Sequence, residues 1–182
     1  ALPSLGFIDV VMYDACNMAY TETVSLWHGY ATAVCGSEET EGMNGIEYDY
    51  ILYRLVANPD STPDQVAIWT AQSAVWQGGE ATHSASAADD RLHTLYSAMN
   101  QWSEAMMGGL PEYRSAYSSA FAAAARPGDL WDMAYQIYIS SQISDPTIKA
   151  GAKAVMDAFN TVVLWEGHSG GEPEVHGLMI DY

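Results

Sequence analysis

The stretch VVMYDACNMA, residues 10–19, decides how the rest of the chain is organised. Residues 10–13 are apolar, which is typical of a strand covered on both faces in a parallel sheet. No Gly or Pro occurs from Asn17 until Gly29, so we expect a helix from Asn17 to about His28. Cys16 then lies at the carboxyl end of a strand and at a helix N-terminus, a position that suits a ligand site and favours a thiolate. A catalytic cysteine and a packed structural cysteine both fit this position.

Composition narrows the function classes. The chain has 182 residues, 49% of them apolar, which is enough for one domain with a core. No apolar run approaches the ~20 residues of a membrane span, so none is expected. With 23 acidic against 6 basic residues the net charge is -17, which disfavours nucleic acid as a partner. The acidity either attracts cationic substrates or metal ions, or only keeps the protein in solution.

Two apolar segments, 7–13 and 31–35, flank the expected helix and predict a right-handed β-α-β unit with parallel strands. The polar loop 36–45 follows the second strand, so it should lie beside Cys16 at the same edge of the sheet. Cys35, inside the second strand, is expected to be buried and inert. Because the chain opens on Ala1 and almost directly enters a buried strand, we expect that a further segment precedes it.

Helical patterns account for most of the remaining chain. Residues 46–56 carry an apolar stripe of Tyr48, Ile51, Leu52 and Leu55, and Thr62-Pro63 opens a further helix that stops at Gly78-Gly79. Later helices are expected at 89–108, ended by Gly108-Gly109, at 111–126, from the cap Asp129, and over a stripe at 152–163. Residues 80–88 are either a loop or an edge strand, 167–173 a loop, and 175–182 a last strand.

A cysteine nucleophile needs a base, and the sequence does not identify one. The expected helix would place His28 about 15–18 Å from Cys16, too far to act as the base. None of the other histidines has a position that pairs it with Cys16. The five histidines are His28, His83, His93, His168 and His176.

Two further patterns carry weaker signals. Residues 167–171 match G-x-S-x-G, but a nucleophile elbow needs a helix after it and none is evident, so a serine esterase using Ser169 is only a further alternative. A metal cluster of His168, Glu172, Glu174 and His176 fits no known ligand spacing, so a polar loop is expected there.

Asp14 adds a carboxylate close to Cys16. Side chains two apart on a strand point the same way, so both would face one side of the sheet end. There Asp14 either binds the Arg or Lys of a substrate through a charge-assisted pair, or orders the loop as a cap.

The motifs YDACNMA at 13–19, GSEET at 36–40 and DY at 49–50 together resemble the clostripain family of cysteine peptidases, which share the caspase-like fold. Residues 128–132 and 176–180 add weaker similarity, so the resemblance covers nearly the whole chain. It implies an α/β, caspase-like three-layer sandwich with a mostly parallel sheet and a helix-rich C-terminal half. Residues 1–182 would form a single domain, the C-terminal (heavy-chain) part of a peptidase catalytic domain.

The resemblance also implies roles for individual residues. Cys16 maps to the nucleophile, and Asp14 maps to an acidic residue of the pocket that binds Arg or Lys before the cut. A second acidic residue often occurs where this chain has Asn44, although Glu41 lies close by. The family's base is a histidine upstream of the cysteine, and no histidine precedes Cys16. It is therefore expected on a light chain cut from the same precursor.

The resemblance bears on cofactors and location as well. Some members of the family need calcium, but the acidic loops offer no identifiable ligand set, so no cofactor is certain. A bacterial enzyme that is secreted, periplasmic or on the cell surface is expected, acting on peptide or protein substrates. The alternative is a non-catalytic binding or assembly module that kept the fold.

Overall fold

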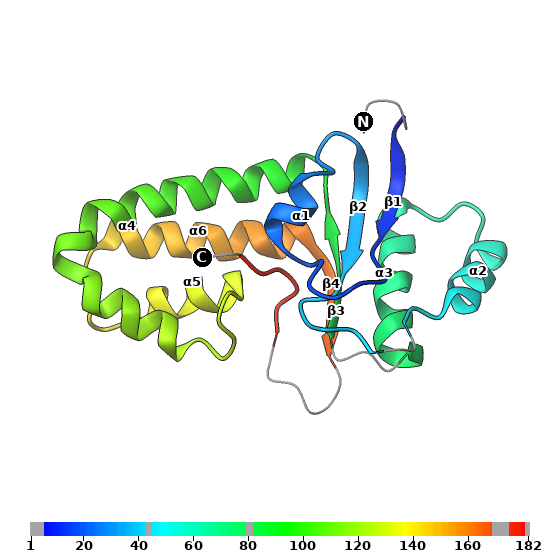
Figure 1. Ribbon diagram of the computed structural model, residues 1–182. Helices are drawn as coiled ribbons and strands as arrows, with labels where there is room; N and C mark the ends of the chain where they lie inside the picture. The colour runs from blue at the N-terminus through cyan, green and yellow to red at the C-terminus, as the bar shows by residue number, and fades with distance from the viewer. Residues whose placement is uncertain (1–5, 43–44, 79–81, 169–174, 181–182) are drawn as a thin grey trace.

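The computed structural model describes residues 6–42, 45–78, 82–168 and 175–180, and these form an α/β fold around one sheet (Figure 1). The strands β1 (Ile8–Met12), β2 (Ala31–Gly36), β3 (Thr82–Ala87) and β4 (Val163–His168) are hydrogen-bonded in the order β1-β2-β3-β4. β1 and β2 are parallel, as predicted, with Ile8 opposite Ala31. The pairings of β2 with β3 and of β3 with β4 are antiparallel, so the sheet is mixed and the expected mostly parallel sheet is wrong.

The error traces to β3 and β4. β3 has the sequence THSASA, expected as a loop or an edge strand, yet all six residues are buried and it lies inside the sheet. Its small side chains allow close approach by the helix α3 (Pro63–Ser73), whose Ala67 and Ala71 pack with Ala85 of β3. β4 was not predicted, because Val163 continues the apolar stripe of the preceding helix.

Helices cover both faces of the sheet and give three layers (Figure 1). On one face α3 and the π-helical turn Ala74–Gly78 pack against the strands, with α2 (Tyr48–Ala57) beyond them. On the other face lie α1 (Thr21–Ser25), α4 (Asp90–Ala123), α5 (Leu130–Ile139) and α6 (Pro146–Val162), which enclose the larger core. The expected starts of two helices are confirmed, since Thr62 caps α3 and Asp129 caps α5 with their side chains.

The helix expected from Asn17 to His28 is mostly absent, because α1 spans only Thr21–Ser25. Asn17 has a left-handed φ of 56°, and the N–H of Ala19 binds the carbonyl of Ser37 at 2.9 Å. This backbone therefore pairs with the segment after β2 instead of entering a helix. Cys16 lies in a turn and not at a helix N-terminus, so the helix dipole does not act on its thiol.

The expected end of a helix at Gly108-Gly109 is instead a bend within α4, which runs through Pro111. The hydroxyl of Tyr117 reaches the carbonyl of Met106 at 3.2 Å. Eleven residues of straight helix would separate these positions by about 16 Å. The bend folds the far part of α4 back (Figure 1), as a proline inside a helix allows. None of the described helices offers a stretch long and apolar enough to cross a membrane.

The apolar stripe predicted for α2 does not face the core of this chain. Only Ile51 is buried, whereas Leu52 is 62% exposed and Tyr48 is 50% exposed. Leu55 is 36% exposed. The described chain leaves this apolar helix face exposed, and exposed apolar faces of this kind often mark interaction sites.

Residues 175–180, called the strap below, were expected to form a strand but make only isolated bridges through Met179. The strap ties α1 to α5. The N–H of Thr21 binds the carbonyl of Met179, and the N–H of Leu130 binds that of Leu178. Residues 181–182, the end of the expected strand, lie outside the described residues.

Candidate functional site

Several chain segments meet at one edge of the sheet, just beyond the carboxyl ends of β1 and β2. The N–H of Asn17 binds the carbonyl of Glu39 at 2.9 Å. The N–H of Glu41 donates to the sulfur of Cys16 at 3.3 Å. The polar loop after β2 therefore lies beside the cysteine, as the parallel pair predicted. The Cys16 thiol is free and exposed.

The turn that carries Cys16 is packed directly on the end of β2. A Cβ added to Gly36 would lie 2.8 Å from the carbonyl carbon of Met18. Only glycine allows this approach of backbone to backbone. Cys35, one residue earlier, is buried, its thiol donates to the carbonyl of Ala67, and burial raises its pKa. Cys35 is thus buried, as expected, whereas Cys16 is exposed and not a packed structural cysteine.

Asp14 is exposed at this edge and is held by two neighbours. The hydroxyl of Tyr48 donates to Oδ2 at 2.8 Å, and this hydrogen bond raises the pKa of Tyr48. Gly45, with φ of 65°, lies so close that an added Cβ would be 2.6 Å from Oδ1. Because β1 ends at Met12, strand alternation does not orient Asp14 and Cys16, and the turn and the α2 entrance do so instead.

Glu41 does not present its carboxylate to solvent. The side chain is 5% exposed, and Oε1 lies 3.2 Å from Nδ1 of His83, whose side chain is fully buried on β3. Within the described residues, neither of these two atoms has a partner in hydrogen-bond geometry. Asn44 lies outside the described residues. Sequence reasoning missed His83 because it did not place residues 82–87 inside the sheet.

A second histidine pair lies at the strap. His176 contacts the fully buried Asp129, which accepts from its backbone N–H at 2.8 Å and lies 3.1 Å from Nδ1. The ring of His176 stacks on Trp131 at 4.5 Å. Burial lowers the pKa of His176, but the hydrogen bond and charge of Asp129 outweigh it and raise that pKa overall. Over the described ranges, no histidine hydrogen-bonds to the sulfur of Cys16.

The loop after β2 is anchored by buried polar side chains. Ser37 donates to the carbonyl of Thr82 at 2.8 Å, and Glu39 forms an ion pair with Arg126. Glu38 is 2% exposed and accepts from the N–H of Gly177 at 2.9 Å. Burial, with the nearby charge of Asp129, raises the pKa of Glu38 to about 8. The backbone beside Cys16 is therefore fixed to both β3 and the strap.

The described residues contain no group of three His, Cys, Asp or Glu side chains placed to hold a metal ion. No calcium ligands can therefore be assigned among them. Ser169, Glu172 and Glu174 lie outside the described residues. His168, expected in a loop, ends β4.

No protein-family model and no curated protein sequence matches this chain. Solved structures do match its fold, and they are C11 cysteine proteases of the clostripain type. The similarity defines an α/β, clostripain-like fold with a mixed four-stranded sheet and many helices, at identities that establish the fold alone.

Three of these structures cover nearly all of this chain. A secreted C11 cysteine protease from Bacteroides thetaiotaomicron, iotapain, matches with a TM-score of 0.68 and 13% identity over 98% of this chain and 51% of its own. An inactive zymogen C11 protease from Parabacteroides distasonis matches with a TM-score of 0.64 and 16% identity, over 97% of this chain and 53% of the zymogen chain. A clostripain from Bacteroides thetaiotaomicron, in complex with the peptide inhibitor BTN-VLTK-AOMK, matches with a TM-score of 0.66 and 12% identity. The match covers 98% of this chain and 80% of that clostripain chain. The chain therefore spans about half the length of the first two.

Proposed function

We propose that this chain is the nucleophile-bearing, C-terminal part of the catalytic domain of a clostripain-type cysteine endopeptidase. The observation that carries the proposal is the exposed thiol of Cys16 at the carboxyl edge of the sheet, where a loop N–H contacts its sulfur. The fold shared with C11 proteases supports it. The Cys16 thiolate attacks the carbonyl carbon of the scissile bond, and the leaving amine takes a proton from a histidine.

Backbone N–H groups assist this chemistry. The N–H of Glu41 donates to the Cys16 sulfur at 3.3 Å, and a hydrogen bond to a thiolate favours the charged, nucleophilic form. The N–H of Cys16 itself is the proposed donor to the oxyanion that forms on the attacked carbonyl. Both donors belong to backbone that the strap and β3 hold in place.

Asp14 is the proposed partner of an Arg or Lys side chain before the cut. Its carboxylate is exposed and is oriented by Tyr48 and Gly45, so it can pair with a cation at the same edge as the thiol. Asn44 and the loop at Glu41 are the proposed further lining of that pocket. Since the carboxylate of Glu41 is directed at His83, Asp14 is the stronger determinant of basic selectivity.

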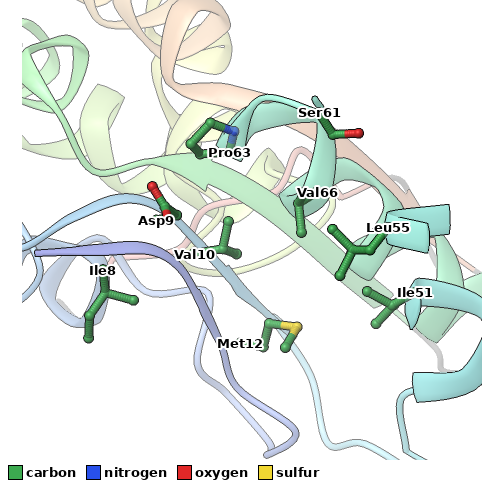
Figure 2. Close-up of a pocket in the computed structure, with 9 residues that line it drawn as sticks. All are labelled: Ile8, Asp9, Val10, Met12, Ile51, Leu55, Ser61, Pro63 and Val66. Atoms are coloured by element: carbon green, nitrogen blue, oxygen red, sulfur yellow. The ribbon is translucent and has the colours of Figure 1, made fainter. Parts of the chain in front are cut away.

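The proposed base is a histidine on a light chain cut from the same precursor. The described surface offers a site for such a segment along β1, an edge strand that pairs on one side only. A groove of about 460 Å³ runs between β1 and the helices α2 and α3 (Figure 2), lined by Ile8, Asp9, Val10, Met12, Ile51, Leu55, Ser61, Pro63 and Val66. A strand added along β1 would cover this groove and the open face of α2.

The proposed setting follows that of the structural relatives. One of them is a secreted bacterial protease, and we place this protein outside the cytoplasm, secreted, periplasmic or on the cell surface, with peptides or proteins as substrates. A non-catalytic binding or assembly module is the alternative, favoured by the absence of a histidine hydrogen-bonded to Cys16 within the described residues.

Intact mass spectrometry of the natively purified full-length protein separates these functions. The probe is an acyloxymethylketone peptide with Arg beside the reactive group, and a matched probe carries Ala there. We expect two co-purifying chains and one label, lost in Cys16→Ala. In Asp14→Asn, labelling by the Arg probe should fall at least tenfold and labelling by the Ala probe should not. A single chain without label would overturn the peptidase and favour the binding module.

A further inference from the structure

We propose that His83 is a positioning residue for Cys16, acting through Glu41. This inference rests on the proposed function, because it assigns His83 a part in preparing the same thiol. The chain of contacts runs from β3 to the loop after β2 and then to the sulfur, and each contact is short.

Glu41 has two contacts that move together. Its N–H donates to the Cys16 sulfur at 3.3 Å, and its carboxylate lies 3.2 Å from Nδ1 of His83. The carboxylate and the N–H belong to one residue, so a contact that holds the side chain restricts how far the N–H can turn. Release of the carboxylate would free that N–H to turn away from the sulfur.

His83 is suited to be the fixed end of this arrangement. It lies on β3, which is paired on both sides, and stands opposite Gly167 of β4. Its side chain is fully buried. The loop before Glu41 is anchored through Ser37 and Glu39, so the contact with His83 extends the anchored region to the residue that contacts the sulfur.

The pair does not behave as an ordinary structural contact. Within the described residues, both ring nitrogens of His83 and Oε1 of Glu41 are buried without a partner in hydrogen-bond geometry. Buried polar groups in proteins are normally satisfied, and exceptions mark strained or catalytic positions. Because the two atoms already lie 3.2 Å apart, a small shift of the loop would convert this approach into a hydrogen bond.

Glu41 is the carboxylate that contacts His83, and Asp14 and Tyr48 stand near Glu41, since both carboxylates raise the pKa of Tyr48. On the neighbouring strand β2, Cys35 lies opposite Ala85, and burial raises the pKa of its thiol. The contacts by which a change at His83 would reach Cys16 run through Glu41.

The test measures alkylation of Cys16 by iodoacetamide, which carries no basic group, in the full-length protein from pH 5 to 9. Labelling is located by peptide mass spectrometry. We expect His83→Gln and Glu41→Gln each to slow alkylation at pH 7 about tenfold and to move its half-maximal rate to higher pH. The double variant should be no slower than either single variant, because both changes break one path.

Two controls keep the result specific. His176→Gln removes a histidine from the other histidine–carboxylate pair, and His93→Gln removes an exposed one; neither should change the alkylation profile. Thermal unfolding establishes that each variant is folded, and Glu41→Gln, in a loop, carries the test if the β3 variant does not fold. Unchanged profiles in folded His83 and Glu41 variants would overturn this inference and leave the peptidase proposal standing. A Cys16 that is inert in the parent protein would overturn both.

Discussion

Two histidine–carboxylate pairs lie on opposite faces of β3, and they are built differently. On the α3 face, His83 and Glu41 approach to 3.2 Å without hydrogen-bond geometry in the described structure. On the other face, the strap places His176 on Asp129 with both a backbone and a ring contact. Asp129 also caps α5 through the N–H of Asp132.

The difference between the two pairs predicts different roles, stability for Asp129 and His176 and reactivity for Glu41 and His83. Both carboxylate oxygens of Asp129 accept hydrogen bonds, so we expect this side chain to stabilise the fold. The pair beside Cys16 lacks hydrogen-bond geometry in the described structure, and it adjoins an exposed thiol, the nucleophile proposed above. We therefore expect changes on the Asp129 side to alter stability, and changes on the Glu41 side to alter reactivity.

The largest effect on the strap side is expected at Glu38, which has one oxygen bound by Gly177 and the other without a hydrogen-bond partner in the described structure. Its pKa of about 8 in the fold lies above its usual value of 4.5, so the folded state holds a proton that the unfolded state has lost between these pH values. Stability should therefore fall as pH rises from 5 to 8, by a few kcal/mol (about 1.4 per pH unit at most).

Glu38→Gln removes this titration and keeps an oxygen acceptor for Gly177. Urea unfolding of the full-length protein at pH 5, 6.5 and 8 should give a flatter dependence for the variant than for the parent. Equal slopes for the two proteins would show that Glu38 is not protonated in the fold.

The next effect is expected for Asp129→Asn. The amide leaves the cap and the His176 contact without a charged acceptor at a site that is fully buried. We expect a loss of about 2–4 kcal/mol in the free energy of unfolding. Glu41→Gln is the matched change in the other pair and should cost less than about 1 kcal/mol, since that pair lacks hydrogen-bond geometry. Denaturation curves that show equal costs would remove the contrast between the two faces.

A smaller effect is expected for Gly45→Ala, on the Cys16 side. The new Cβ would meet Oδ1 of Asp14 at 2.6 Å, at a backbone φ of 65° that costs an L-residue about 1–2 kcal/mol. Asp14 must move, so labelling of Cys16 by the Arg probe should fall about tenfold relative to the Ala probe. Gly6→Ala, which also has a positive φ but open space at the Cβ, is the control for strain alone. An equal loss of Arg-probe labelling in Gly45→Ala and Gly6→Ala would show that Asp14 does not determine basic selectivity.

The smallest effect is expected for His176→Gln. The raised pKa of His176 means that its stabilisation is complete below the unfolded pKa of about 6.5 and is lost as pH rises through the folded pKa. The variant should be up to about 1 kcal/mol less stable than the parent at pH 5.5, and the difference should shrink at pH 8.5. The exposed His93→Gln serves as the reference, and a difference that grows with pH would reverse the assigned sign.

The sequence predicted the parts of this site that local rules govern. The apolar runs identified β1 and β2 as a parallel pair, and adjacent parallel strand ends brought Cys16 and the loop at Glu41 together. The helix start at Thr62-Pro63 and the cap at Asp129 were confirmed, because a proline in the first turn and a short polar side chain before an apolar stripe are local signals. The resemblance to clostripain, drawn from short motifs, agrees with the fold of the matched structures.

What the sequence could not predict depends on long-range packing. β3 is interior because alanines of α3 and small residues of β3 fit one another, and no pattern within 82–87 reveals that fit. The turn at Asn17 displaced a helix because the backbone found partners at Ser37 and Glu39. The contact of Glu41 with His83 depends on both, so the proposed positioning residue was not visible in the sequence.

The strap has a consequence for when the surroundings of Cys16 form. The turn that follows Cys16 is closed by Met179, whose N–H donates to the carbonyl of Ala19 and whose carbonyl accepts from the N–H of Thr21. The loop beside it is closed by the N–H of Gly177, which donates to Glu38, 139 residues away along the chain. During synthesis these partners leave the ribosome long after the cysteine does. Such distant contacts also form late in folding. The exposed thiol of Cys16 therefore stays in unfinished surroundings while the nascent chain is still being made.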